Sequence, residues 1–196
     1  MIDDQDLIKK ILAGNTNAYA EIVRAYQAKV LGLCTSLLGD AVQSEDAAQE
    51  IFIKAYQALR SFRGSSTFST WIYRIAANHC KDLLRKRSRE KTESLDALME
   101  ASGEKAQKLW EPSFDPGAAA EASDTLGKLL SSLSPDERLI LTLREIQGLN
   151  YREISGVLQC SLDAVKSRLR RAREALEEKV PARPAGGRHF SDRKNV

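Results

Sequence analysis

Apolar side chains recur every three or four residues along most of the chain, and the strict alternation typical of strands is absent. In the first half, this spacing predicts one helix around residues 19–33, a second over 44–59 and a long third over about 69–87. A Gly-Asp pair separates the first two, and Ser44 is the expected cap of the second. Glycine and proline are sparse in these segments, so we expect an all-α fold.

The helical pattern fades after residue 90, where Asp, Glu, Ser, Gly and Ala dominate and Pro112 and Pro116 interrupt the chain. We interpret this stretch as a flexible linker between two helical domains. Trp110 and Phe114 are unusual in a spacer, and we interpret them as docking on a neighbouring domain. The predicted organisation is a first domain, a linker, a second domain and a disordered tail, over residues 1–90, 91–120, 121–180 and 181–196.

The second domain carries clear signals for helix starts. Ser134 with Glu137, and Asn150 with Glu153, have the spacing of capping boxes. A tight turn at 159–161 then separates a short helix from a longer basic helix. Two helices joined in this way predict a helix-turn-helix, whose second helix enters the major groove of duplex DNA.

The formal net charge of +3 conceals an uneven distribution. Residues 60–91 hold nine Lys or Arg against two acids, and residues 164–173 hold five Lys or Arg and no acid. An acidic stretch separates these two clusters, and residues 40–53 hold four acids and no base. Basic clusters attract nucleic acid, although a solvated helix face is the alternative interpretation of any one of them.

Several classes of protein are disfavoured by composition. No apolar run of about 18 residues exists, so we expect no membrane insertion, and the acidic N-terminus does not resemble a secretory signal. Cys34, Cys80 and Cys160 lie far apart without CxxC spacing, which favours inert thiols in a reducing cytoplasm over disulfides or zinc. Because there are only two histidines, no Gly-rich phosphate loop and no nucleophile motif, we expect no enzyme, catalytic residue, metal or cofactor.

The predicted long helix has one face that suits nucleic acid with unstacked bases. Aromatic rings stack on bases, amides hydrogen-bond to base edges and cations hold the backbone. The loop before this helix is short and polar enough to hold a flipped base. The alternative places the tryptophan in the core and leaves the cations solvated. The residues that share this face are Trp71, Arg74, Asn78, Lys81 and Arg85.

The last helix has a polar face opposite its expected buried stripe. Arginine can read guanine edges in a bidentate manner, and lysine and serine can hold phosphates. The alternative is a basic surface helix in an ordinary bundle. The outward residues of the last helix are Lys166, Ser167, Arg170, Arg171 and Glu174.

The acidic helix over 44–59 is interpreted as a surface for a protein partner, with a solvated face as the alternative.

The residues now resemble a known family. The runs AAQEIFIKAY (47–56) and FSTWIYRIAAN (68–78) resemble region 2 of bacterial sigma factors. The runs LSPDER (133–138), GLNYREI (148–154) and VKSRLRRAR (165–173) resemble region 4. Two regions in this order, joined by a short linker, are similar to the extracytoplasmic-function (ECF) subfamily of the sigma-70 family.

The resemblance implies a promoter-specificity factor for core RNA polymerase, with three sets of site residues. Those for core polymerase are Asp46, Gln49, Glu50, Phe52 and Lys54. Those for the melted, single-stranded −10 element are Phe62, Arg63, Gly64, Ser65, Trp71, Arg74, Asn78 and Lys81. Those for the duplex −35 element are Arg144, Lys166, Ser167, Arg170 and Arg171.

Two departures from the family pattern affect the expected sequence preferences. Gly64 is followed by two serines where the family often has an aspartate, and Arg170 stands where an apolar residue is common. The promoter sequence is therefore not transferred. The family also implies an anti-sigma protein as a partner. The alternative functions are a stand-alone helix-turn-helix transcriptional regulator, which leaves the face of Trp71 unused, and an enzyme acting on nucleic acid.

Overall fold

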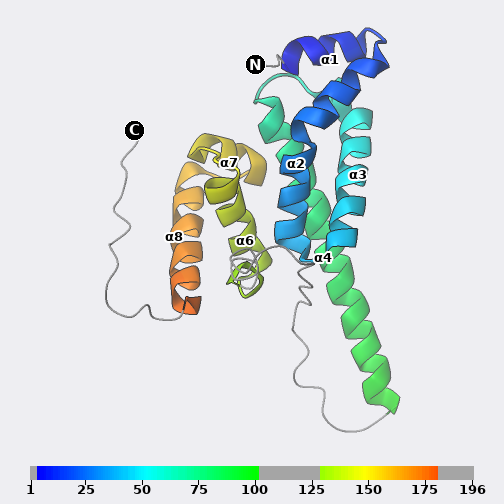
Figure 1. Ribbon diagram of the computed structural model, residues 1–196. Coiled ribbons are helices and arrows are strands. Elements are labelled where there is room, and N and C mark those ends of the chain that lie inside the picture. The colour runs from blue at the N-terminus through cyan, green and yellow to red at the C-terminus, as the bar shows by residue number, and fades with distance from the viewer. Residues whose placement is uncertain (1–3, 102–128, 181–196) are drawn as a thin grey trace.

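The computed structural model describes residues 4–101 and 129–180, and its regular elements in these ranges are all helices (Figure 1). The first range contains α1 (Asp4–Leu12), α2 (Tyr19–Leu38), α3 (Ala41–Ala58) and α4 (Phe68–Ala101), with short 3-10 helices η1 (Thr16–Ala18) and η2 (Leu59–Ser61). The second contains α6 (Pro135–Leu141), the π-helix η3 (Thr142–Ile146), α7 (Tyr151–Leu158) and α8 (Leu162–Lys179). The all-α prediction is confirmed, and none of these helices is both long and apolar enough to cross a membrane.

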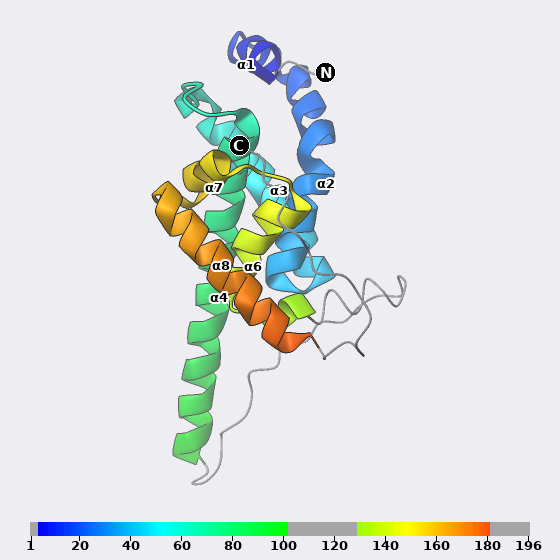
Figure 2. The same ribbon diagram turned by 90° about the vertical axis from the view of Figure 1, so that its left-hand side faces the viewer.

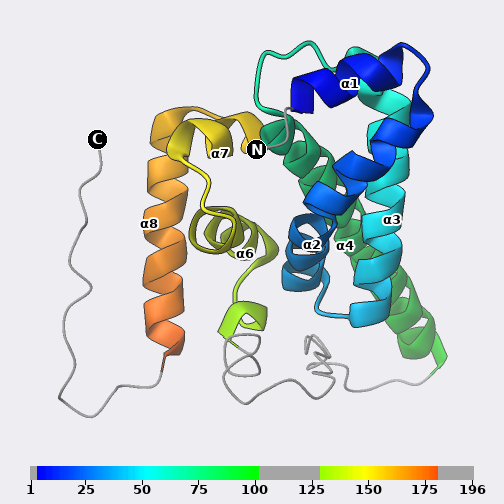
Figure 3. The same cartoon turned by 45° about the horizontal axis from the view of Figure 1, so that its top comes forward.

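The first domain is a bundle of α2, α3 and α4, with α1 lying across one end (Figures 1 and 3). The predicted helical stripes form its core, because side chains three and four residues apart share one face. Ile75 and Leu83, which the sequence placed in this stripe, are only half-buried. The fully buried residues include Ile22, Val30, Leu33, Ile51, Ala55, Ile72 and Ala76.

The junction between α2 and α3 corrects one sequence prediction. Gly39 adopts a left-handed conformation with φ +70°, which ends α2. Asp40 follows as the N-cap of α3, and its carboxylate accepts a hydrogen bond from the Gln43 amide at 2.8 Å. Ser44 is therefore not the cap: it is buried inside the first turn, and its hydroxyl donates to the Asp40 carbonyl.

The second domain follows the predicted signals closely. Both capping boxes are present, at Ser134 with Glu137 and at Asn150 with Glu153. Gln159 takes a left-handed conformation with φ +50° and turns the chain between α7 and α8. Val165, Leu169 and Ala172 of α8 are buried where this helix packs on α6 and α7, so the helix-turn-helix prediction is confirmed.

α4 is much longer than the sequence pattern suggested. It starts at Phe68 and continues to Ala101, so the first eleven residues of the predicted linker belong to this helix. Its C-terminal end projects beyond the rest of the bundle (Figures 1 and 2). Trp110, Phe114 and the tail from residue 181 lie outside the described residues, so the predictions made for them stay predictions.

The two domains pack against each other along α4 and α2, which the expectation of two linked domains did not include. Tyr73 of α4 donates to the Gln147 side chain at 2.7 Å, and the buried Arg138 donates to the Leu37 carbonyl at 3.0 Å. α6 and α7 occupy the space between α8 and the first domain (Figures 1 and 3). α8 is therefore on the outside of the molecule.

Candidate nucleic-acid interfaces and partner surface

The outer side of α3 exposes apolar residues among polar ones. We call the residues Val42, Asp46, Gln49, Ile53 and Tyr56 the α3 outer face, because steps of four, three, four and three place them in one row. Val42, Ile53 and Tyr56 are 71%, 57% and 42% exposed. Exposed apolar side chains collected in one row are typical of protein-binding surfaces, whereas isolated ones are ordinary.

Phe52 corrects the predicted partner surface. Its side chain is only 8% exposed, and its carbonyl accepts a hydrogen bond from the Tyr19 hydroxyl at 2.6 Å. It lies on the buried stripe with Ala55 and Leu59, a spacing that the sequence already displayed. The outward apolar residue is its neighbour Ile53, which the sequence reasoning missed. The other predicted residues of this surface, Asp46, Gln49, Glu50 and Lys54, are exposed.

A histidine of α4 lies directly beneath two residues of the predicted partner surface. His79 is 5% exposed, and its Nδ1 is 2.6 Å from the Lys54 ammonium. Its Nε2 is 3.4 Å from Glu50 Oε2, and Lys54 Nζ is 3.9 Å from the same oxygen. Burial lowers the pKa of His79, and the Lys54 charge lowers it further, while Glu50 and Asp82 oppose that change. No spacing in the sequence indicated these polar contacts.

Trp71 corrects the predicted exposed face of α4. It is 5% exposed and packs on Phe62 and Phe68, with ring centroids 5.4 Å apart in both cases. Tyr26 of α2 adds an edge-to-face contact to Phe68 at 5.2 Å. Because four aromatic rings shield one another here, the tryptophan belongs to the core, which was the alternative interpretation.

The loop before α4 is anchored at both ends and exposed at its tip. Phe62 is half-buried in the aromatic cluster, and the Thr67 hydroxyl accepts from the Thr70 amide at 3.2 Å at the start of α4. Between them Arg63, Gly64 and Ser65 are exposed, and Gly64 has φ +70°, a conformation that favours glycine. The exposed tip of the loop is therefore held between two anchored ends, at Phe62 and at Thr67.

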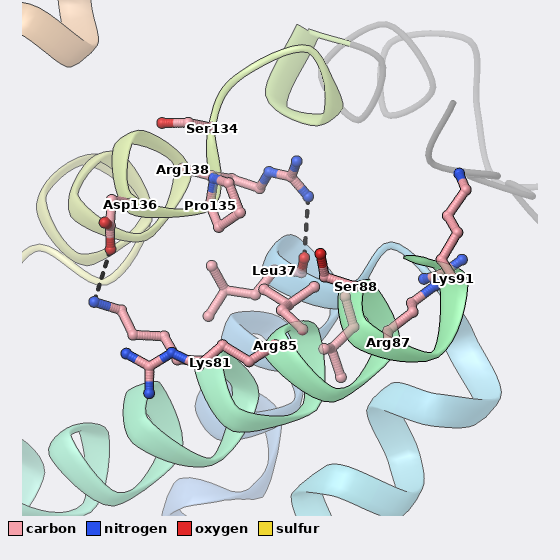
Figure 4. Close-up of a pocket in the computed structure, with 12 residues that line it drawn as sticks. Leu37, Lys81, Arg85, Arg87, Ser88, Lys91, Ser134, Pro135, Asp136 and Arg138 are labelled. Atoms are coloured by element: carbon pink, nitrogen blue, oxygen red, sulfur yellow. Dashed lines mark hydrogen bonds and ion pairs between the residues drawn. The ribbon is translucent and has the colours of Figure 1, made fainter. Parts of the chain in front are cut away.

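The other residues of α4 that were predicted to bind nucleic acid differ in exposure and in ion pairing. Asn78 is exposed and Arg74 is half-buried. Lys81 forms an ion pair with Asp136 of α6 at 2.7 Å, across the boundary between the domains (Figure 4). Arg85 pairs with Asp82 one turn away at 3.2 Å. The row that the sequence predicted is therefore not one open surface.

The predicted residues of α8 are all exposed. Lys166 pairs with Asp163 at 3.2 Å, and Arg170 with Glu174 at 2.9 Å, both within the helix. Exposed pairs of this kind contribute little to stability, so these cations remain available to another anion. Ser161 caps the helix and accepts from the Ala164 amide at 3.2 Å, as predicted.

Arg144 lies on η3 and is half-buried beside the start of α7. Its guanidinium donates to the Leu149 carbonyl at 2.9 Å and lies over the Tyr151 ring, 5.2 Å from the centroid. Arg173, which the sequence reasoning did not select, pairs with Glu145 at 2.9 Å and links α8 to η3. These contacts hold the helix-turn-helix together.

Cys34 and Cys80 face each other in the core of the first domain. Both are fully buried, and their sulfur atoms are 3.7 Å apart as free thiols. The contact with Cys34 and burial raise the pKa of the Cys80 thiol above its usual range. A thiol in this environment is a poor nucleophile, which agrees with the predicted inert core thiols.

Comparison with known proteins identifies two conserved regions in the chain. The family described as "Sigma-70 region 2" matches residues 22–90, and the family described as "Sigma-70, region 4" matches residues 123–176. The RNA polymerase sigma-H factor of Pseudomonas aeruginosa is 40% identical over 178 residues, which cover 89% of this chain and 92% of the relative. The ECF RNA polymerase sigma-E factor of Escherichia coli is 39% identical over 184 residues, covering 91% and 95%.

Solved structures share the fold. CnrH, in complex with the cytosolic domain of CnrY, matches with a TM-score of 0.65 and 23% identity, covering 89% of this chain and 95% of that one. The sigma factor RpoE of Bartonella quintana, in complex with the anti-sigma factor NepR, matches with a TM-score of 0.63 and 24% identity, covering 82% and 94%. At these identities the likeness concerns the arrangement of helices.

Proposed function

The chain belongs to the sigma-70 family of RNA polymerase sigma factors, of the extracytoplasmic-function type, and on that premise we propose which of its surfaces bind core polymerase and promoter DNA. As a sigma factor it binds core polymerase and directs it to promoters, rather than acting as a stand-alone helix-turn-helix regulator. We also propose that it works in the cytoplasm and that the catalytic groups for RNA synthesis belong to the core enzyme.

The α3 outer face is the surface we assign to core polymerase, and it is the observation that carries this proposal. It combines exposed Val42, Ile53 and Tyr56 with Asp46 and Gln49. Apolar side chains at the centre of a polar rim are typical of interfaces between proteins. The four acids and absence of bases over residues 40–53 make this face unsuited to DNA, because phosphates repel carboxylates.

Substitution of Ile53 by glutamate tests this assignment. Reconstitution of the full chain with core polymerase should show a loss of affinity of more than tenfold for Ile53→Glu, because a charge replaces an exposed apolar side chain of the face. Leu12→Glu is the matched control, since Leu12 is also a half-exposed apolar helix residue, on α1. Equal affinities for the two variants would contradict the assignment, and a wild-type chain that never initiates from a genomic promoter library would contradict the function.

For the −10 element, we assign the loop tip Arg63–Ser65 together with Arg74 and Asn78 to single-stranded DNA. The tip is exposed and held by its aromatic base, so a base can be captured without ordering the loop first. Trp71 does not contact the DNA itself in this assignment, but its ring packs on Phe62 and supports the loop. Lys81 joins this surface only after its ion pair with Asp136 is broken.

For the −35 element, we assign the outer side of α8 to the major groove of duplex DNA. Lys166, Ser167, Arg170 and Arg171 are exposed, and α8 lies on the side of the molecule away from the first domain (Figure 2). Arginines on a helix of this kind contact guanine edges, while lysine and serine hold phosphates. Arg144 supports this surface through Leu149 and Tyr151.

A groove between the domains is our assignment for an anti-sigma protein. It has a volume of about 360 Å³, and its apolar floor is formed by Leu37, Leu84 and Pro135. Four cations and one acid, Asp136, lie around it, so an amphipathic segment with acidic residues would be complementary in both polarity and charge (Figure 4). The cations are Lys81, Arg85, Arg87 and Lys91.

A further inference from the structure

The protonation state of His79 follows from its contact with Lys54. A lysine ammonium can only donate, so the Nδ1 of His79 at 2.6 Å has to accept. The imidazole is therefore neutral, with its proton on Nε2. Nε2 is 3.4 Å from Glu50 Oε2 but forms no hydrogen bond to it, and it is buried without a hydrogen-bond partner in the described residues. One buried ring thus contacts both members of the Glu50–Lys54 pair.

The contact with His79 restricts the mobility of the Glu50–Lys54 pair. Glu50 and Lys54 are one turn apart, their side chains are 59% and 50% exposed, and their charged atoms are 3.9 Å apart. Such a pair on its own leaves two long side chains free to move. With Nδ1 of a buried ring as its acceptor, the ammonium of Lys54 has one defined position, and ordering it in advance reduces the entropy lost on binding.

We propose that His79 is a positioning residue for core polymerase binding: its neutral imidazole holds Lys54 in its binding arrangement beside Glu50 and releases Lys54 when it becomes protonated. The inference rests on the proposed role of α3 and on the sequence-based assignment of Glu50 and Lys54 to the surface for core polymerase. Protonation removes the acceptor of Lys54 and places two positive charges at 2.6 Å, so the lysine must leave.

The charges around His79 give the direction of the pH dependence. Lys54 and Glu50 face it from α3, and Asp82 lies one turn along α4. Burial is the largest effect and lowers the pKa of His79, as does Lys54. The neutral, holding form therefore prevails at neutral pH, and acidification below the ordinary histidine range favours release.

Nuclear magnetic resonance tests the contact without polymerase. The chain has only two histidines, so His189→Asn leaves His79 as the single imidazole. Its ring nitrogens should show the tautomer with the proton on Nε2 and a pKa below the ordinary value. Lys54→Met should raise that pKa. A ring with its proton on Nδ1, or a pKa indifferent to Lys54→Met, would overturn the proposed holding contact.

Affinity for core polymerase between about pH 5.5 and 8 tests the consequence. The wild type and the matched control His189→Asn should both bind more weakly on acidification. His79→Asn keeps an acceptor near Lys54 but cannot titrate, so its affinity should lose the extra dependence on pH. His79→Leu removes the acceptor and should weaken binding by about tenfold at neutral pH, the effect of about one charge-assisted hydrogen bond.

The outcomes separate the inference from the proposed function. If the wild type binds core polymerase and His79→Asn shows the same dependence of affinity on pH, the positioning role is overturned and the proposed function is not. Failure of the wild type to bind core polymerase at any pH overturns the proposed function and, with it, this role. Circular dichroism of each variant identifies any that does not fold, and His79→Asn then provides the decisive comparison with His189→Asn.

Discussion

The two basic helices α4 and α8 carry similar side chains but present them in different ways. On α8 the cations Lys166 and Arg170 are exposed and paired only with acids of their own helix. On α4 the tryptophan of the candidate row is buried under Phe62, and Lys81 is paired with Asp136 of the other domain. A similar pattern of residues therefore produces one open surface and one partly covered surface.

The difference follows from the number of neighbours that each helix has. α8 packs through one stripe on α6 and α7, so its opposite side is free. α4 packs on α2 and α3 on one side and on α7 on another, which leaves a narrower surface for ligands. We conclude that the surface proposed for the −35 element is open in this arrangement, whereas the surface proposed for the −10 element is narrower and has one of its cations, Lys81, paired with the other domain.

The largest expected effect is at Trp71. Trp71→Ala should lower the free energy of unfolding by about 3–5 kcal/mol, because it removes a buried ring from a four-ring cluster. Urea denaturation of the full chain measures this change. Arg85→Ala, an exposed residue of the same helix, should change stability by no more than about 0.5 kcal/mol. A Trp71→Ala variant as stable as Arg85→Ala would mean that the ring is not in the core.

The contact between the domains should be sensitive to a methyl group at Gly156 of α7. A Cβ there would lie 2.9 Å from Thr70 Cγ2 of α4, so Gly156→Ala should disfavour the packed arrangement by about 1–3 kcal/mol. The helix itself gains from alanine, so the second domain should remain folded. Small-angle X-ray scattering should show a larger radius of gyration.

Two variants control for this effect. Gly32→Ala also adds a methyl group near the boundary, but its nearest atom is Gln147 Nε2 at an ordinary 3.8 Å, so the radius should not change. Adding Thr70→Ser to Gly156→Ala removes the opposing methyl group and should restore the compact form. No rescue by the serine would indicate that the Gly156–Thr70 contact does not control the packing.

Arginine 170 of α8 should affect DNA binding without affecting stability. Arg170→Ala is expected to reduce the affinity of the reconstituted holoenzyme for duplex −35 DNA by about tenfold, since an exposed arginine on the outer side can contact a guanine edge. Arg168→Ala is the matched control, because Arg168 is an exposed arginine of the same helix that was not assigned to the −35 element and lines a pocket with Glu137 and Ile140 of α6. Fluorescence anisotropy at one salt concentration gives both values. If Arg168→Ala weakened binding as much, general charge rather than the outer side would explain the effect.

The smallest expected effect concerns the ion pair between Lys81 and Asp136. Asp136 is 77% exposed and Lys81 29%, so the pair should favour domain packing by less than about 1 kcal/mol despite its length of 2.7 Å. A double-mutant cycle with Lys81→Met and Asp136→Asn measures this coupling energy from unfolding curves. A coupling energy above about 2 kcal/mol would show that this contact dominates the closed arrangement.

Local signals were readable from sequence where the physical cause was local. The capping boxes at Ser134 and Asn150 and the turn at 159–161 were predicted correctly, because each depends on residues within a few positions. Ser44 was misjudged as a cap because Asp40, four residues earlier, provides the stronger carboxylate acceptor. Phe52 was assigned to the partner surface by resemblance, although its own helical spacing placed it in the core.

The sequence alone determined the central helices of both domains, most of their buried stripes and the helix-turn-helix, because periodicity and capping act within one turn of the chain. It did not give the helix α1 or the C-terminal extension of α4. Only the tertiary structure decided which polar and aromatic side chains are free. Burial of Trp71, the contact of His79 with Lys54 and the pairing of Lys81 with Asp136 each join residues from different helices. Such contacts depend on how the helices and domains pack, and no spacing within a single helix specifies them.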